Sequence, residues 1–494
     1  MSPSRPPSPP VPESLDPRVW RIACVALLGP LMISLDSTVV NISLARLGQE
    51  LGAPLTTIQW VTSGYLLALA LMLPLSGWLV DRVGAKRVYL GCFTAFTLAS
   101  VACGGAASAR ALVGFRVLQG MTGGLLVPMA QMVTAREAGR FLPRVMGIMV
   151  VPILLGPICG PVLAGFILQH GSWRWIFFIN LPIGVLAILL AAWILPGDAH
   201  DLRPRPFDLT GFLMLSPGLA LLLHSLDCLS AGLPGKLINQ VELAAALALL
   251  GGFVLNGRRR GSAALIELGL FRSKAFSAAA LTQVLTNAVA FGGQMLLPLY
   301  LLTVRQASPG RAGMLLIPAG LGMLCTMPLM GPLTERHGSR RVSSAGALLA
   351  LAGTLPFASA AFADGPVWAL CLAIFVRGAG LGAIGIPSIA VAYSAIPREK
   401  IPMATTAINI VQRLGGPVAT TGLAIYLHAR MLALAEGGHF WLAQAQGHAQ
   451  AFALTFRVLC VLHAAAVLAA LRLPAWAEYG HAQAGRAAVE SVAE

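Results

Sequence analysis

The sequence predicts an all-α polytopic membrane protein, with two six-helix halves and two further helices inserted between them. First, 57% of the 494 residues are hydrophobic and only 11% are charged, whereas soluble domains average about 25% charged residues. Second, apolar stretches of about 20 residues recur without the alternation of barrel strands. Third, two segments of the first half recur in the second. So few charges cannot cover a water-facing surface, which excludes a soluble enzyme, a disordered chain and a fibrous protein.

The apolar stretches number about fourteen, and each is long enough to cross the roughly 30 Å hydrocarbon layer as a helix. Charged residues or Gly/Pro turns bound them. In chain order the expected spans are 20–41, 57–80, 88–108, 111–134, 143–168, 173–196, 209–226, 237–256, 275–303, 312–333, 342–362, 366–394, 404–428 and 449–473. The seventh is the shortest of them and contains His224.

The net charge of +15 is explained by membrane topology rather than by nucleic-acid binding. Most lysines and arginines lie in alternate loops, as the positive-inside rule requires, and no basic stripe with interleaved aromatic residues is present. The basic loops include 82–87, 136–144, 258–274 and 336–341. We therefore expect a multi-pass protein of the cell inner membrane with both termini in the cytoplasm and an uncleaved first span.

The chain lacks the motifs of common enzymes and of metal or cofactor sites. Its eight cysteines form no CxxC pair, and the one CxxH, Cys460 with His463, has no second pair of ligands beside it in the sequence, so neither a disulfide framework nor a metal site is indicated. No P-loop, HExxH or GxSxG pattern occurs, which argues against an ATPase, a zinc hydrolase and a serine hydrolase. We therefore expect no enzymatic activity, no cofactor and no nucleic-acid partner. Transport would have to use an ion gradient, and protons are the simplest choice.

An internal repeat relates the two halves. The segment GWLVDRVGAKR at 77–87 recurs as GPLTERHGSRR at 331–341, and GPV at 160–162 recurs at 416–418. Two segments with offsets of 254 and 256 residues indicate duplication, and repeated halves are typical of transporters that alternate access around a central site. The expected organisation is a disordered cytoplasmic tail at 1–19, a six-helix bundle at 20–196, two inserted helices with linkers at 197–272, a second six-helix bundle at 273–473, and a cytoplasmic tail at 474–494.

Five motifs in fixed order resemble those of the major facilitator superfamily, and in particular its 14-helix drug:proton antiporter branch, the EmrB/QacA family. They are LDSTVVNISL at 35–44, GWLVDRVGAKRV at 77–88, RVLQG at 116–120, GPICGPVLAG at 156–165 and SWRWIFFINLPIG at 172–184. The resemblance covers nearly the whole chain. It implies the superfamily fold, multidrug or metabolite efflux by proton antiport, and in some relatives a periplasmic adaptor protein as partner.

Two residues are candidates for proton coupling. Asp36 is the only carboxylate expected near mid-membrane, where a charged form costs roughly 2.5–3.5 kcal/mol. A low dielectric favours its neutral form, which suits a proton carrier; the alternative is a structural hydrogen bond to a neighbouring helix. The resemblance implies a role in proton transfer for Arg116, by tuning a nearby acid. The alternative for Arg116 is a side chain that reaches out from a helix end.

The repeated loop is a candidate gate on the cytoplasmic side. A glycine in it permits a tight turn, and its acidic residue is able to cap a helix or pair with an arginine across the bundle. Such a charge pair would hold the cytoplasmic side closed and break on inward opening; the alternative is that the loop only sets topology. The expected gate residues are Gly77, Asp81, Arg82, Gly84, Lys86, Arg87, Glu335 and Arg336.

The GPICGPVLAG segment supplies small residues at nearly GxxxG spacing, together with prolines that kink a helix. These residues allow close helix approach and bending between the halves, and the resemblance associates them with export direction. The alternative is ordinary packing of small residues. The residues concerned are Gly156, Pro157, Gly160, Pro161 and Gly165.

Polar residues of the later spans are candidates for a watery cavity. Gln283 and Asn287 are four residues apart, so they share one helix face, and Asn409 and Arg413 repeat that spacing; for the amides, hydrogen bonds between helices are an equal alternative. The expected cavity residues are Asn41, Gln119, Gln283, Asn287, Arg377, Asn409 and Arg413. Because arginines outnumber the single central carboxylate, we expect neutral or anionic organic substrates.

These observations predict a proton-coupled secondary active transporter that exports small organic molecules by alternating access. Protonation of Asp36 and occupancy by substrate are expected to compete for one central cavity, or to be coupled through it. Two alternatives remain open: a metabolite importer or uniporter of the same fold, which differs in the direction of flux, and a non-transporting membrane sensor, which predicts no flux at all. The expected partners are the small-molecule substrate, protons and the lipid bilayer.

Overall fold

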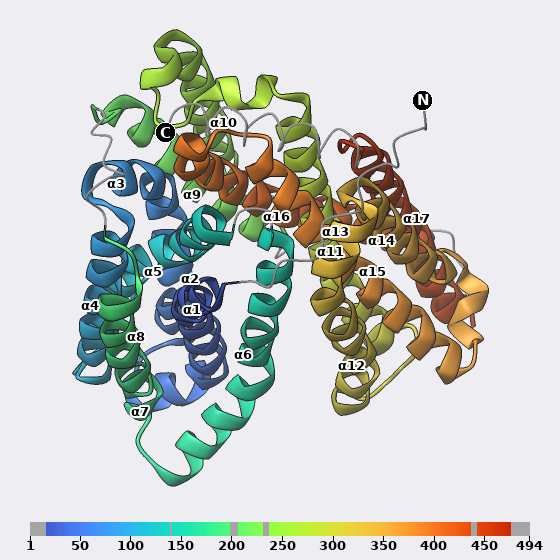
Figure 1. Ribbon diagram of the computed structural model, residues 1–494. Helices are drawn as coiled ribbons and strands as arrows, with labels where there is room; N and C mark the ends of the chain where they lie inside the picture. The colour runs from blue at the N-terminus through green and yellow to red at the C-terminus, as the bar shows by residue number, and fades with distance from the viewer. Residues whose placement is uncertain (1–15, 139–140, 198–205, 231–236, 436–441, 476–494) are drawn as a thin grey trace, which may run out of the picture.

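The computed structural model describes residues 16–138, 141–197, 206–230, 237–435 and 442–475. Within these ranges the chain forms helices and no strand (Figure 1), which confirms the predicted all-α fold. The tails expected at the two ends lie almost entirely outside the described residues.

The first group of helices packs around α1 and α5. Its elements are α1 (Pro17–Glu50), α2 (Leu55–Met72), η1 (Leu73–Leu75), α3 (Ser76–Val83), α4 (Ala85–Gly104), α5 (Ala109–Ala138), α6 (Leu142–His170), α7 (Trp175–Phe178) and α8 (Asn180–Ile194). The helix α1 contacts α5, α6 and α8, while α5 also contacts α2 and α4. We call this group the N-terminal half; it occupies the left side of Figure 1.

The second group packs around α11 and α15. Its elements are α11 (Lys274–Thr303), α12 (Pro309–Thr326), η5 (Met327–Leu329), α13 (Met330–His337), α14 (Ser339–Thr354), η6 (Leu355–Ala358), η7 (Ala360–Asp364), α15 (Val367–Ser394), η8 (Arg398–Lys400), α16 (Ile401–Ala435) and α17 (Leu442–Leu471). Here α15 contacts α12 and α14, and α11 contacts α15, α16 and α17. We call this group the C-terminal half.

A pair of helices, α9 (Leu209–Ser230) and α10 (Leu237–Arg260), connects the two halves, followed by η3 (Gly261–Ala263) and η4 (Leu268–Arg272). Asp208 caps α9 by accepting a hydrogen bond from Gly211 N, and it pairs with Arg260 at 3.1 Å. Because α9 also contacts α2 of one half and α16 of the other, this pair lies against both halves. The boundaries predicted for the two bundles and the inserted pair stay a prediction.

Twelve helical segments among the described residues are long and apolar enough to cross a membrane. The helices α6, with 29 residues, and α16, with 35 residues, are long enough but fall outside that set. In α16 the polar residues Asn409, Gln412 and Arg413 interrupt the apolar run. The prediction of fourteen spans therefore stays a prediction, whereas a multi-pass membrane protein is established.

The repeated loop adopts the same local structure in both halves. The eight-residue helices α3 and α13 end at Gly84 and Gly338, whose φ angles are 102° and 83°. These are left-handed values that glycine adopts without steric cost, and the next helix begins at once after each turn. We call the end of the molecule with these two turns the basic end, because Arg87 and Arg340 lie there exposed. The opposite end is the distal end.

Two glycines let α2 and α5 approach closely. A Cβ atom at Gly120 or Gly124 of α5 would overlap the backbone carbonyl of Tyr65 or Leu69 on α2. In lipid, no hydrophobic driving force holds helices together, so their association depends on close van der Waals packing, which small residues allow. This contact therefore fixes the position of α2 against the rest of the N-terminal half.

Replacing Gly124 with alanine is expected to lower the stability of the folded protein. The added methyl must displace backbone, and overpacking of this kind costs about 1–3 kcal/mol. Thermal unfolding of the purified protein in detergent measures the effect. Gly114→Ala is the matched control, because Gly114 is exposed on the same helix and a Cβ there meets nothing within 4 Å. Equal melting temperatures for both variants would contradict the prediction.

Candidate functional site

A cavity of about 850 Å³ lies between the two halves. Its walls come from α2 and α5 of the N-terminal half, α11 and α16 of the C-terminal half, and α9 of the inserted pair. Along α2 the lining begins at Thr56, beside the distal end, and stops at Leu67. The volume falls in the range of about 300–1,000 Å³ typical of small-molecule sites.

The cavity wall combines aromatic, amide and charged side chains. Trp60 and Phe291 line it from opposite halves, with 48% and 47% of their surface exposed. Five amide side chains also line it: Gln59, Gln131, Asn287, Asn409 and Gln412. The inserted helix α9 contributes His224 and Asp227, and α16 contributes Arg413. A mixed wall of this kind suits organic molecules that have both flat apolar faces and polar groups.

The inserted pair holds His224 in place. Its Nδ1 lies 3.0 Å from Glu242 Oε2 of α10, and its ring stacks on Trp60 at a centroid distance of 6.3 Å. Thr421 of α16 donates a hydrogen bond to Leu226 O of α9 at 2.9 Å. The helix α9 is thus a part of the cavity wall.

Polar contacts between the halves close the basic end. The hydroxyls of Ser76 and Thr406 are 2.9 Å apart, and Arg144 pairs with Glu335 at 2.7 Å. Nearer the cavity, Asn409 Nδ2 donates to Gln131 Oε1 at 2.7 Å. These three contacts connect α3, α6 and α5 to the C-terminal half.

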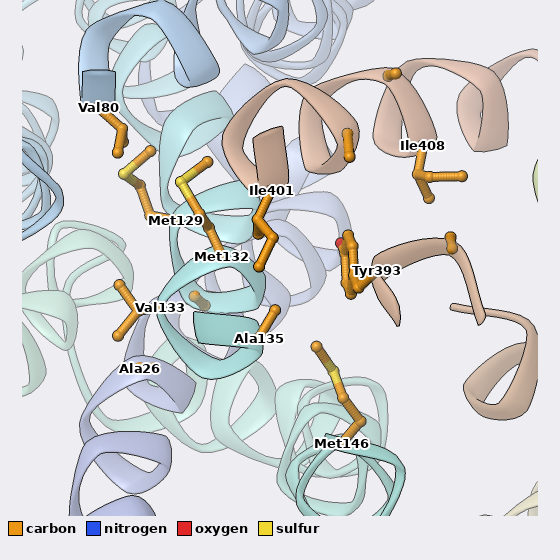
Figure 2. Packing of buried hydrophobic residues seen from close by; sticks show 14 of the residues in the cluster. Ala26, Val80, Met129, Met132, Val133, Ala135, Met146, Tyr393, Ile401 and Ile408 are labelled. Atoms are coloured by element: carbon orange, nitrogen blue, oxygen red, sulfur yellow. The ribbon is translucent and has the colours of Figure 1, made fainter. Parts of the chain in front are cut away.

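An apolar cluster joins both halves. Figure 2 shows Met132 of α5, Met146 of α6, Tyr393 of α15 and Ile401 of α16 gathered between the helices. All four side chains are less than 10% exposed. Methionine is unbranched and adapts its shape to irregular surroundings, which suits an interface that separates and re-forms.

Asp36 lies in a closed polar cluster inside the N-terminal half. Arg116 Nη1 donates to Asp36 Oδ2 at 2.6 Å, Asn180 Nδ2 donates to Asp36 Oδ1 at 2.8 Å, and Gln119 Nε2 donates to the same oxygen at 3.2 Å. All four side chains are completely buried. The carboxylate is therefore fully compensated, as a buried charge must be.

The helix α2 separates this cluster from the cavity. Its inner face supplies Val61 O, which accepts a hydrogen bond from Arg116 Nε at 3.1 Å, and Tyr65, whose ring lies 4.0 Å from the guanidinium carbon. Its other face supplies Trp60 and Ser63 to the cavity wall. Asp36 does not line the cavity, which corrects the expectation that a proton and a substrate compete there directly.

Three of the expected cavity residues line the cavity, namely Asn287, Asn409 and Arg413. The other four lie elsewhere, which corrects the prediction for them. Asn41 is exposed on α1 because it lies five positions, or about 140°, round the helix from Asp36. Gln119 lies one turn from Arg116 and is drawn into the polar cluster.

Gln283 and Arg377 are buried inside the C-terminal half. Gln283 Nε2 donates to Ser388 Oγ at 2.7 Å, and its carbonyl oxygen accepts from Gln412, so it supports a cavity residue from behind. Arg377 donates to Val289 O at 2.7 Å and is 3% exposed. For the amide of Gln283, the alternative of hydrogen bonds between helices describes the structure better.

The expected gate residues all lie at the basic end. Gly77 faces Pro402 and Thr406 of α16, where a Cβ atom would lie 3.0 Å from Pro402 O. Lys86 donates to Ala192 O at 2.7 Å, which ties it to its own half. Arg82 stacks on Trp78 at 5.6 Å, while Arg87 and Arg336 are exposed and Asp81 is buried. Of the predicted set, Gly77 and Glu335 make contacts between the halves that the structure records.

The GPICGPVLAG segment packs within one half. Gly156 and Gly160 of α6 lie against Ser34 and Thr38 of α1, so the close approach predicted for them exists but does not lie between the halves. A Cβ at Gly165 would meet nothing within 4 Å. The side chains of Pro157 and Pro161 lie outside the described part of the chain.

Several residues of the site were not predicted from the sequence. Arg144 was recognised only as a basic loop residue, and Asn180 only as part of the SWRWIFFINLPIG motif. Ser76 and Thr406, which meet across the halves, carry no signal in a single sequence. A histidine inside an apolar span, such as His224, indicates a functional site, and this signal could have assigned His224 to the cavity.

Comparisons with known proteins agree with this architecture. Residues 26–420 match the sequence profile described as Major Facilitator Superfamily. The chain is 36% identical over 437 residues to "Multidrug resistance protein B homolog" of Mycobacterium tuberculosis, with 86% of this chain and 80% of the relative covered. It is 32% identical over 415 residues to "Tetracenomycin C resistance and export protein" of Streptomyces glaucescens, with 84% and 77% covered.

Among solved structures, the proton:xylose symporter XylE superposes on this chain with a TM-score of 0.59, covering 90% of this chain and 94% of that chain at 16% identity. A likeness at this level of identity shows the fold. Together with the sequence match, it confirms the resemblance found in the motifs. The chain therefore belongs to the major facilitator superfamily of membrane transporters.

Proposed function

We propose that this transporter exports small organic molecules across the cell inner membrane in exchange for protons, by alternating access. The observation that carries the proposal is the cavity of about 850 Å³ between the halves, which is closed at one end by contacts that join those halves. An alternating-access transporter needs a central site that is closed at one end while it is open at the other.

The basic end faces the cytoplasm in this proposal. Exposed arginines gather there, including Arg82, Arg87, Arg336 and Arg340, and the positive-inside rule assigns such loops to the cytoplasm. Both termini then lie on the cytoplasmic side. The conformation is accordingly outward-facing, with the substrate site accessible from the distal end.

Protons are the proposed energy source. A buried carboxylate paired with arginine has two states of very different energy, since removing one charge leaves the other uncompensated at a cost of about 3–5 kcal/mol. Asp36 and Arg116 form such a pair at 2.6 Å. Tyr65 and Val61 of α2 contact Arg116 directly, so a change in the pair moves the helix that forms the cavity wall.

The names of the relatives support export of organic compounds. One is named for multidrug resistance and one for tetracenomycin C resistance and export. The cavity wall fits cargo of this kind, because it offers two aromatic faces, Trp60 and Phe291, beside five amides.

Flux measurements in proteoliposomes test the proposal. Vesicles that contain the full chain and have an acidic lumen should accumulate rhodamine 123 or fluorescein above protein-free vesicles, with the membrane potential clamped. Dye retained on filters is assayed after lysis at one fixed pH. Dissipating the pH gradient should abolish the accumulation. Accumulation driven instead by an alkaline lumen would indicate symport, and the absence of gradient-driven flux of either dye would refute proton-coupled export.

A further inference from the structure

Arg413 is a membrane-depth cation without a protein counter-ion among the described residues. It lies near the middle of α16 and lines the cavity. No carboxylate lies within 4 Å of its nitrogens, and no hydrogen bond to it is recorded within the described ranges. Two further buried arginines differ from it: Arg116 pairs with Asp36, and Arg377 donates to Val289 O inside the C-terminal half and does not line the cavity.

The acidic groups near the cavity do not compensate Arg413. Glu242 is paired with His224. Asp227 lines the cavity from α9 and has an interaction of its own, but it forms no ion pair with Arg413. A guanidinium at this depth is expensive unless it meets an anion, a carbonyl or water. Arg413 therefore presents a positive charge to whatever enters the cavity.

The surroundings of Arg413 indicate the shape of the ligand as well as its charge. Trp60 and Phe291 are each about half exposed, at 48% and 47%, and line the same cavity. Large exposed aromatic side chains bind flat apolar surfaces. Gln412, the residue before Arg413, also lines the cavity. Its amide is held in place by a hydrogen bond to Gln283 at 2.7 Å.

We propose that Arg413 binds the negative charge of the transported molecule and that the preferred cargo is a flat aromatic anion. The guanidinium presents a planar fork that matches a carboxylate or sulfonate bidentately, while the aromatic side chains contact the ring system. This inference rests on the proposed transport function and names the substrate class of its site.

Two dyes that share one ring skeleton test the inference. Fluorescein and rhodamine 123 are both xanthenes, but at neutral pH fluorescein is an anion and rhodamine 123 is a cation. Equilibrium binding to the purified full-length protein is measured by fluorescence anisotropy. Fluorescein should bind about tenfold or more tightly than rhodamine 123, because a hydrogen-bonded charge contact is worth at least that factor.

Variants of Arg413 assign the preference to this side chain. Arg413→Gln should weaken fluorescein binding about tenfold while leaving rhodamine 123 binding unchanged or tighter, and Arg413→Lys should retain part of the fluorescein affinity. Arg430→Gln is the matched control, because Arg430 is exposed on the same helix and stacks on Tyr426 outside the cavity. An unchanged melting temperature shows that the variants fold.

The outcomes separate this inference from the proposed function. Equal binding of both dyes, or an equal loss of both in Arg413→Gln, would overturn the anion site, even if proton-driven flux persists. Selective binding of fluorescein without flux driven by a pH gradient would support the anion site and overturn proton-coupled export instead.

Discussion

Asp36→Asn is expected to abolish transport driven by a pH gradient while dye binding in the cavity persists. The substitution removes the only carboxylate of the buried cluster, so no group remains there to exchange a proton. The cavity wall survives, because Asp36 and the lining residues lie on opposite sides of α2. Flux into vesicles with an acidic lumen and fluorescein anisotropy measure the two effects separately.

A second variant distinguishes proton coupling from folding. Asp36→Asn leaves Arg116 buried and unpaired, which costs about 3–5 kcal/mol of stability. The double variant Asp36→Asn with Arg116→Gln removes both charges and should recover most of the lost melting temperature. Transport should stay absent in the double variant. Gradient-driven accumulation at the wild-type level in either variant would rule out Asp36 as the coupling group.

Gly331→Ala is expected to prevent closure of the basic end and to stop the transport cycle. A Cβ atom at Gly331 of α13 would overlap the backbone of Arg144 on α6, so the two halves are forced apart. Such overlap costs about 1–3 kcal/mol, which changes the population of the closed state by roughly fivefold to 150-fold. The nearby ion pair of Arg144 and Glu335 is about one-quarter exposed, and a pair of that kind contributes at most about 1 kcal/mol. The glycine contact is therefore the larger effect.

Distances between spin labels measure this closure. Labels at the exposed positions Arg87 and Arg340 lie on different halves at the basic end, and Gly331→Ala should shift their distance distribution to longer values. Gly320→Ala is the control, since a Cβ at Gly320 of α12 meets nothing within 4 Å. An unchanged distribution with normal flux would show that the halves close without this contact.

The sequence predicted the features that depend on local pattern. The repeat of the 77–87 segment indicated a duplicated turn, and Gly84 and Gly338 adopt the same positive φ at the same place. The apolar stretches predicted the helices, and Asp36 stood out because carboxylates are rare in such stretches. Each of these signals lies within a few residues of the chain.

Partners that are distant in the sequence were harder to predict. Asp36 and Arg116 were each singled out, but their contact spans 80 positions and depends on how α1 and α5 pack. Gln119 was assigned to the cavity although it lies one turn from Arg116, and its place on the same helix face could have assigned it to the cluster. Arg144 needed a partner from the other half, which no single helix pattern reveals.

The two faces of α2 have a consequence for how such a pump acquires new resistance. In the proposed export cycle, exchanging Trp60 or Ser63, which line the cavity, is expected to change the range of transported molecules and to leave the pair of Asp36 and Arg116 behind the helix intact. We therefore expect single substitutions on the cavity face of α2 to change substrate range without loss of proton coupling.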